Sequence, residues 1–234
     1  MIWQKQLATL LIAVTGLMAF GAGELPDEFL FNLVKLTYSS ENTPTARAGT
    51  TGSVASVKGA LHNRWVVFSV DYYPNHKISK TRNAWVDDVT LTLRAVFDGI
   101  SQGRKVTCVF SGKTEFMTIP IDGRRHVALM MIPPQLLDRY LPPGGSGSTI
   151  SGNTISAEAV FTDSDGKIAG IGFCNVKGSS LAQQRQAFAK MLQGKSNIVR
   201  DGVILSKDES PWRWIDFSDY DYIKPSCVKK ENNL

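Results

Sequence analysis

The chain has 234 residues, the length of one globular domain or at most two small ones, and 43% of them are hydrophobic. Its 26 basic and 21 acidic residues give a formal net charge of +5, which can favour association with acidic surfaces. Basic residues such as Lys35, Lys58 and Arg64 are scattered, and no basic run is longer than a pair. Nucleic-acid-binding proteins normally concentrate such residues in a stripe or patch, so the composition argues against a nucleic-acid partner.

The N-terminal segment differs in character from the rest of the chain. One positive charge precedes an apolar stretch of 14 residues, Leu7 to Phe20. A helix needs roughly 20 apolar residues to cross a bilayer, and here small residues follow at Gly21 and Gly23, as a signal peptidase requires. We expect residues 1–23 to be a cleaved signal peptide, with an uncleaved anchor helix as the alternative. Residues 24–234 would then be one exported domain without a stable membrane span, in the periplasm, on the outer surface or outside the cell.

Hydrophobic and polar residues alternate along residues 66–72 and 89–97. Successive side chains of a strand point to opposite faces, so this period of two predicts strands with one buried face. Similar patterns predict further strands at residues 29–38, 53–58, 106–110, 115–121, 124–132, 155–161 and 168–176. Asp163 to Gly166 stands between the last two runs and is typical of a hairpin turn, because Gly accepts the positive φ that such turns need. A calcium loop is disfavoured there because Cys174 occupies the position of the closing Glu.

Helices are few in this sequence. Ser180 and Gln183 form a capping box, and Gly194 is well placed to end a helix over residues 180–193. A shorter helical turn is expected after Pro133, and two polar loops are expected at residues 39–52 and 144–153. Many short strands with few helices predict a mainly β fold: an antiparallel, Ig-like β-sandwich with one added α-helix in the C-terminal half. A barrel is the alternative.

Three cysteines are present, Cys108, Cys174 and Cys227, so at most one intramolecular disulfide can form. Cys108 and Cys174 both fall in expected core strands, and facing sheets could bring their Cα atoms within about 7 Å. We therefore predict a Cys108–Cys174 disulfide and a free Cys227. The alternative is that the two residues are small buried hydrophobic side chains that remain thiols.

No constellation typical of catalysis or of metal binding is found. The three histidines, His62, His76 and His126, lack metal-ligand spacing, and no Gly-x-Ser-x-Gly motif is present to position a nucleophile. Gly170 to Gly172 lacks the third glycine of a dinucleotide fingerprint. The sequence predicts neither enzymatic activity nor a cofactor or metal site.

The most unusual segment is an aromatic C-terminal extension at residues 211–224. Its five aromatic side chains are candidate interaction residues, namely Trp212, Trp214, Phe217, Tyr220 and Tyr222. Such rings can stack on sugars or anchor a protein interface. The alternative, which we favour, is that the extension folds back on its own domain, because the rings would otherwise expose a large apolar patch.

The export-type N-terminus, the many-stranded body and the aromatic extension together resemble secreted Ig-like proteins encoded with bacterial type IV pilus loci. This resemblance spans about residues 24 to 234 and implies a structural or adhesive role in the cell envelope, with envelope or pilus proteins as partners. In type IV pilins the processing site precedes the hydrophobic helix, whereas here Gly21 and Gly23 follow it. A pilus accessory or surface protein is thus expected rather than a main pilin. The second hypothesis is a secreted carbohydrate-binding module for mucin glycans, with host glycans as partners.

The signal-peptide assignment makes a direct prediction. When the full gene is expressed in an exporting bacterium, the mature protein should begin between Ala22 and Glu24, because small residues follow the short apolar stretch. Intact mass spectrometry of the native protein measures this. A mass that still includes Met1 to Phe20 would contradict cleavage and support the anchored alternative.

Overall fold

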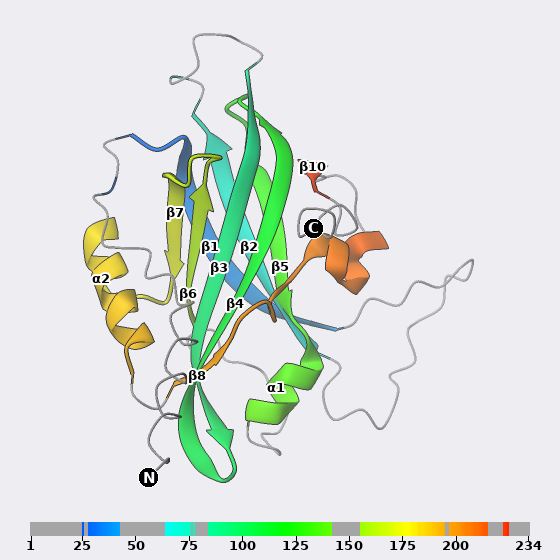
Figure 1. The fold of residues 1–234 in the computed structure, drawn as a ribbon, viewed down its shortest axis with the longest axis vertical. Coiled ribbons are helices and arrows are strands. Elements are labelled where there is room, and N and C mark those ends of the chain that lie inside the picture. Colours follow the sequence, from blue (N-terminus) through cyan, green and yellow to red (C-terminus); the bar gives the residue numbers. More distant parts are fainter. Residues whose placement is uncertain are drawn as a thin grey trace, which may run out of the picture.

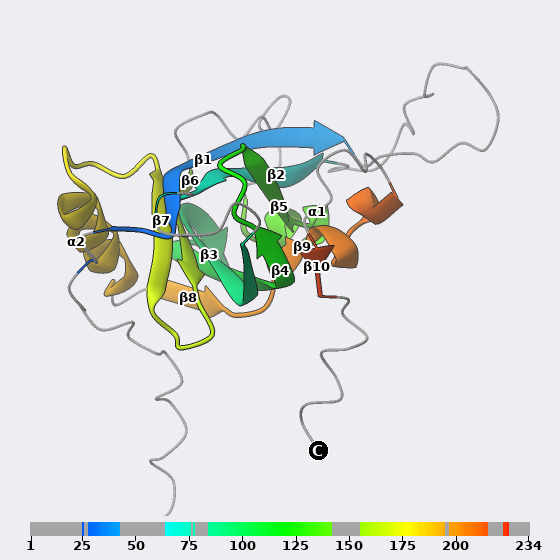
Figure 2. The same cartoon turned by 90° about the horizontal axis from the view of Figure 1, so that it is seen from above.

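The chain folds into two β-sheets that pack face to face. The computed structural model describes residues 25, 28–42, 64–75, 77, 84–141, 155–194, 197–214 and 222–224. Figure 2 shows β1 and β2 in one layer and β3, β4, β6 and β7 in the other. The predicted signal peptide, the strand expected at 53–58 and the loop at 144–153 lie outside the described residues.

The first sheet is antiparallel and has the order β1-β2-β5-β9. Its strands are β1 (Phe31–Asn42), β2 (Arg64–Pro74), β5 (His126–Ile132) and β9 (Leu205–Ser206). The second sheet has the order β10-β4-β3-β6-β7, and β8 adds a parallel pairing to β4. Its strands are β3 (Trp85–Ser101), β4 (Arg104–Pro120), β6 (Ile155–Thr162), β7 (Ile168–Cys174), β8 (Asn197–Arg200) and β10 (Tyr222–Ile223).

This strand order confirms the predicted Ig-like sandwich. In Ig domains the second strand pairs with the fifth in one sheet, while the third, sixth and seventh strands are neighbours in the other. Here β2 pairs with β5, β3 pairs with β6, and β6 pairs with β7. Strand β4 extends the second sheet beside β3, as an additional edge strand does in variable-type domains.

Among the described residues, two α-helices lie outside the sheets (Figure 1). The helix α1 (Pro134–Tyr140) follows β5, and α2 (Leu181–Leu192) confirms the helix predicted at residues 180–193. Ser180 caps α2, because its side chain accepts a hydrogen bond from the Gln183 amide (3.3 Å). Phe188 of α2 packs with Val96 and Val109 on the outer face of the second sheet. In the part of the chain that the structure describes, no helix has the length and apolar character needed to cross a membrane.

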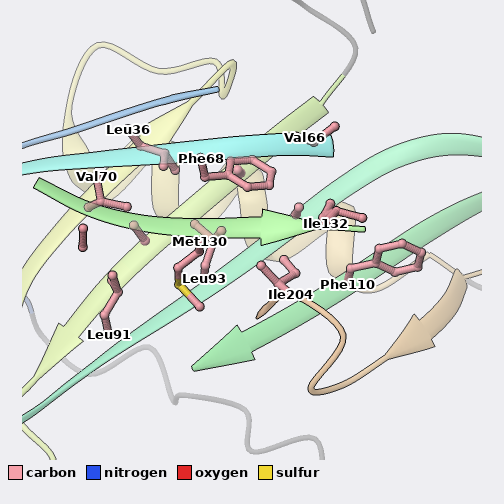
Figure 3. Close-up of a cluster of buried hydrophobic side chains, with 14 of the residues drawn as sticks. Leu36, Val66, Phe68, Val70, Leu91, Leu93, Phe110, Met130, Ile132 and Ile204 are labelled. Carbon is pink, nitrogen blue, oxygen red and sulfur yellow. The ribbon is translucent and has the colours of Figure 1, made fainter. Parts of the chain in front are cut away.

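The core fills the space between the sheets (Figure 3). It is built from the alternating side chains that the sequence pattern assigned to buried faces, including Val66, Phe68 and Val70 of β2 and Leu91 and Leu93 of β3. All five are fully buried, so the period-two pattern identifies the inward face of both strands correctly.

Several strands are longer than expected; β3, for example, spans Trp85–Ser101 where residues 89–97 were expected. The prediction of two separate strands at residues 106–110 and 115–121 is wrong: β4 is one strand, and β3 pairs with it along its whole length. Gly112 interrupts the hydrophobic pattern because another segment passes directly over it, and a Cβ there would lie 1.9 Å from the Ile204 carbonyl oxygen. Strand β1 also continues to Asn42, so residues 39–42 are not part of a loop.

Two glycines allow the N-terminal part of β1 to lie against β7. A Cβ on Gly172 would lie 2.5 Å from the Val34 carbonyl oxygen, and one on Gly170 would lie 2.9 Å from Phe31 Cβ. Real Cβ atoms do not approach other atoms so closely, so only glycine permits this contact. The two sheets therefore approach each other along this side of the sandwich.

Replacing Gly172 with valine should therefore lower the free energy of unfolding by about 1–3 kcal/mol, since the new side chain would overlap the β1 backbone. Urea unfolding of purified protein measures the loss, and Gly172→Ala offers a milder variant if the valine variant does not fold. The control is Gly166→Asn in the β6–β7 turn, where nothing lies within 4 Å and Asn tolerates the positive φ of 76°. Equal stability of Gly172→Val and wild type would contradict the close approach.

Candidate functional site

The C-terminal part of the chain connects the two sheets. We call residues 197–214 and 222–224 the C-terminal strap. Its first strand, β8, pairs with the edge of β4, and β9 pairs with the edge of β5. Between them, the amides of Val203 and Ile204 both donate to the Ser111 carbonyl oxygen (3.0 Å each). After two short 3₁₀ helices, η1 (Lys207–Glu209) and η2 (Pro211–Trp214), the strap returns to β4 as β10.

A buried serine fixes the strap where it leaves β9. Ser206 is fully buried, and both its amide (3.1 Å) and its hydroxyl (2.9 Å) donate to the Glu209 carboxylate. The Ser206 hydroxyl also contacts the Asp208 carboxylate. This reciprocal capping begins η1 and directs the chain onto the outer face of the first sheet.

Trp212 is the one predicted interaction residue whose side chain the structure describes, and it packs on the domain. Its ring lies 5.3 Å from the Trp65 ring at an interplanar angle of 74°, an edge-to-face contact. Trp65 belongs to a cluster on the outer face of the first sheet with Val67 and Met131. Phe217, Tyr220 and the side chains of Trp214 and Tyr222 lie outside the described residues.

The predicted disulfide is wrong. Cys108 of β4 and Cys174 of β7 are both free thiols. Strands β3 and β6 separate β4 from β7 in one sheet, so the two residues are three strand spacings apart, about 14 Å. A disulfide needs Cα atoms within about 7 Å. Burial, with a smaller effect of the Asp98 charge, raises the pKa of Cys108 to about 11, and burial also raises the pKa of Cys174, so neither is a reactive thiolate. Cys227 lies outside the described residues.

His126 has a structural position at the end of the sandwich. Its ring stacks on the buried Tyr72 ring at 5.5 Å, and its Nε2 lies 3.0 Å from Asp122 Oδ1. Burial alone would raise the pKa of Asp122, but the hydrogen bonds from His126 and the Arg124 amide, with their nearby charges, lower it. His62 and His76 lie outside the described residues. Within the described ranges, no group of three His, Cys, Asp or Glu side chains could hold a metal ion.

Two further polar groups also serve the fold. Arg94 of β3 donates to the buried Glu158 of β6 through Nε (3.0 Å), and the two residues are direct cross-strand neighbours. In the β6–β7 turn, Asp163 Oδ1 accepts hydrogen bonds from the amides of Asp165 (3.0 Å) and Lys167 (2.8 Å). These hydrogen bonds support the prediction of a hairpin turn, because the Asp163 carboxylate stabilises the backbone of the turn itself.

One cluster is not apparent from the sequence. Arg104, Arg139 and Arg200 are far apart in the chain and are all exposed. The fold brings Arg139 and Arg200 together at Tyr140, and places Arg104 at the same end of the sandwich. The three arginines lie far apart in the sequence, and of them only Arg104 has a basic neighbour, Lys105, so only the topology reveals this basic surface.

No family model and no curated protein matches the sequence. Among solved structures, a crystal structure of a protein from Akkermansia muciniphila is similar, with a TM-score of 0.55 and 16% sequence identity. The match covers 82% of this chain and 95% of that one. The likeness shows the fold. It agrees with the β-sandwich that the strand order defines.

The packing of Trp212 predicts a loss of stability when its ring is removed. Trp212→Ala should lower the free energy of unfolding by about 2 kcal/mol. A tryptophan ring has a surface of about 150–250 Å², and the substitution removes about half of that area from contact with Trp65 and its neighbours. Urea unfolding measures the change. Trp85→Ala is the matched control, since that ring is 51% exposed, and it should cost less. Wild-type stability in Trp212→Ala would contradict a structural role for the strap.

Proposed function

We propose that this chain is an exported, non-enzymatic structural or interaction protein of the bacterial cell envelope or surface. The observation that carries the proposal is an Ig-like sandwich that follows an export-type N-terminus. This architecture is a common scaffold of cell-surface proteins. The described polar groups that most resemble sites, at His126, Glu158 and Asp163, each make contacts that stabilise the fold, which supports an interaction role over catalysis.

Within this role, we favour an accessory component associated with pili over a main pilin. The support is the resemblance to secreted Ig-like proteins of type IV pilus loci, together with small residues that follow the apolar stretch. A chain cleaved at Gly21 to Gly23 loses the helix through which a pilin polymerises. Its contacts with the pilus would then be made by the surface of the sandwich.

The carbohydrate-binding alternative, with its sugar surface on the aromatic extension, is less favoured. A sugar-stacking platform needs exposed rings that lie in one plane. Trp212 is partly buried and meets Trp65 edge to face, so one of its surfaces is used within the domain. This arrangement supports the structural interpretation of the extension.

Crosslinking in cells tests the proposed function. In the source bacterium, the processed chain should appear in an envelope fraction or in the medium, and formaldehyde should link it to envelope or pilus proteins. Mass spectrometry after fractionation identifies both the compartment and the partners. A chain that stays unprocessed in the cytosolic fraction would contradict the proposal, as would one that crosslinks mainly to cytosolic proteins.

A further inference from the structure

Exposed arginines from three elements gather at the end of the sandwich that carries α1. Arg104 begins β4 after the β3–β4 turn, Arg139 lies in the last turn of α1, and Arg200 ends β8. Figure 1 shows the β3–β4 turn, α1 and β8 at the same lower end of the molecule. A close approach agrees with this view, because a Cβ on Gly99 of β3 would lie 2.9 Å from the Tyr140 carbonyl oxygen at the end of α1. We call Arg104, Arg139 and Arg200 the arginine strip.

Tyr140 positions two of these side chains. Arg200 Nε donates to the Tyr140 hydroxyl (3.2 Å), and Arg139 Cζ lies 5.5 Å from the centroid of the Tyr140 ring, a cation–π contact. Tyr140 itself is 1% exposed and packs edge to face on Phe110 in the core (5.6 Å). The two guanidinium groups therefore both contact a ring that the core holds in place. Their side chains would lose less conformational entropy when a ligand binds.

Arg104 lies on the same side of β4 as this tyrosine. Side chains alternate along a strand, so Arg104 shares a face with the buried Phe110, which contacts Tyr140. Arg104 and Phe110 are six positions apart in β4, and Arg200 is the direct partner of Phe110 in β8, so the strip extends along about 20 Å of the surface. By the same alternation, Asp98 and Lys105 point to the other face of the hairpin. Asp138 is the acidic residue of α1, and Asp201 directly follows Arg200, where its carboxylate accepts a hydrogen bond from the Ser111 hydroxyl (2.7 Å).

We propose that the arginine strip binds an acidic polysaccharide. A guanidinium group is planar and pairs with a carboxylate or sulfate through two parallel hydrogen bonds. An extended glycan with a negative charge on successive sugars could meet the three arginines in turn over their 20 Å span. The choice of a glycan rests on the proposed surface location of the protein. Trp212 of the aromatic extension packs in a different cluster, with Trp65 on the outer face of the first sheet.

The surroundings of the strip favour a glycan over a membrane or a nucleic acid. Among the described residues, the exposed large hydrophobic side chains are Trp85, Met117 and Leu181. Trp85 and Met117 lie towards the opposite end of the β3–β4 hairpin, so neither can enter a bilayer beside the strip. Tyr140 is buried and offers no ring face on which a base could stack.

Binding to chondroitin sulfate tests the proposal with the purified mature chain at an ionic strength of about 0.15 M. The test variant is Arg104→Gln/Arg139→Gln/Arg200→Gln. The control, Lys113→Gln/Lys167→Gln/Lys177→Gln, removes the same charge from exposed positions elsewhere. The wild-type chain should bind chondroitin sulfate but not neutral dextran, and the strip variant should bind about tenfold more weakly. The affinity of the control variant should fall less than threefold, which is the loss expected from about one exposed ion pair.

Tyr140→Phe gives a second test, because it removes the hydroxyl that holds Arg200 and keeps the ring beneath Arg139. It should weaken binding about twofold to threefold, the effect of one surface hydrogen bond, while the melting temperature shows the fold to be intact. Equal losses in the strip and control variants would overturn the proposal, as would the absence of wild-type binding. Tighter binding to anionic phospholipid vesicles or to single-stranded DNA would also overturn it. None of these results would contradict the proposed envelope location, which the crosslinking experiment tests separately.

Discussion

The sandwich depends on Ile204, which is held between the two sheets on the side of β4 and β5 (Figure 3). Hydrogen bonds from the Val203 and Ile204 amides to Ser111 hold this residue over β4, and the absence of a side chain at Gly112 makes room for it. Directly afterwards, β9 pairs with β5. One short segment thus fills the core and joins the edges of both sheets, so the C-terminal strap is part of the domain.

The opposite side of the sandwich is closed in a different way. There β1 approaches β7 through the backbone, and Gly170 and Gly172 supply the space. Exposed strand edges invite pairing with other chains, and proteins usually cover or shorten them. Here β8, β9 and β10 cover parts of the edges of β4 and β5, while β1 lies beside β7. This protection suits the exported role proposed above, and it leaves recognition to side chains at the ends and faces.

The parts of the fold that the sequence predicts are those with a repeating pattern. Strands β2, β3 and β6 each direct every second side chain into the core between the sheets, so hydrophobic residues recur there at every second position. Strands β8, β9 and β10 have two to four residues, too few for a period to appear. Disulfide pairing failed for a related reason: Cys108 and Cys174 both lie in buried strands, but only the strand order shows that one sheet contains both. The aromatic content around Trp212 indicated packing, while its site beside Trp65 depends on the path of the strap.

The basic surface shows why charge runs along a sequence are a poor guide to charge on a folded surface. A net charge of +5 is small for 234 residues, and around the arginines at 104, 139 and 200 no basic run is longer than the Arg104–Lys105 pair. At physiological salt the Debye length is about 8 Å, so charges act together only when folding brings them close. Tyr140 does this for Arg139 and Arg200. The buried Tyr140 and the turn that carries Arg104 therefore determine which positive charges a polyanion would contact. The total charge of the chain contributes little to this.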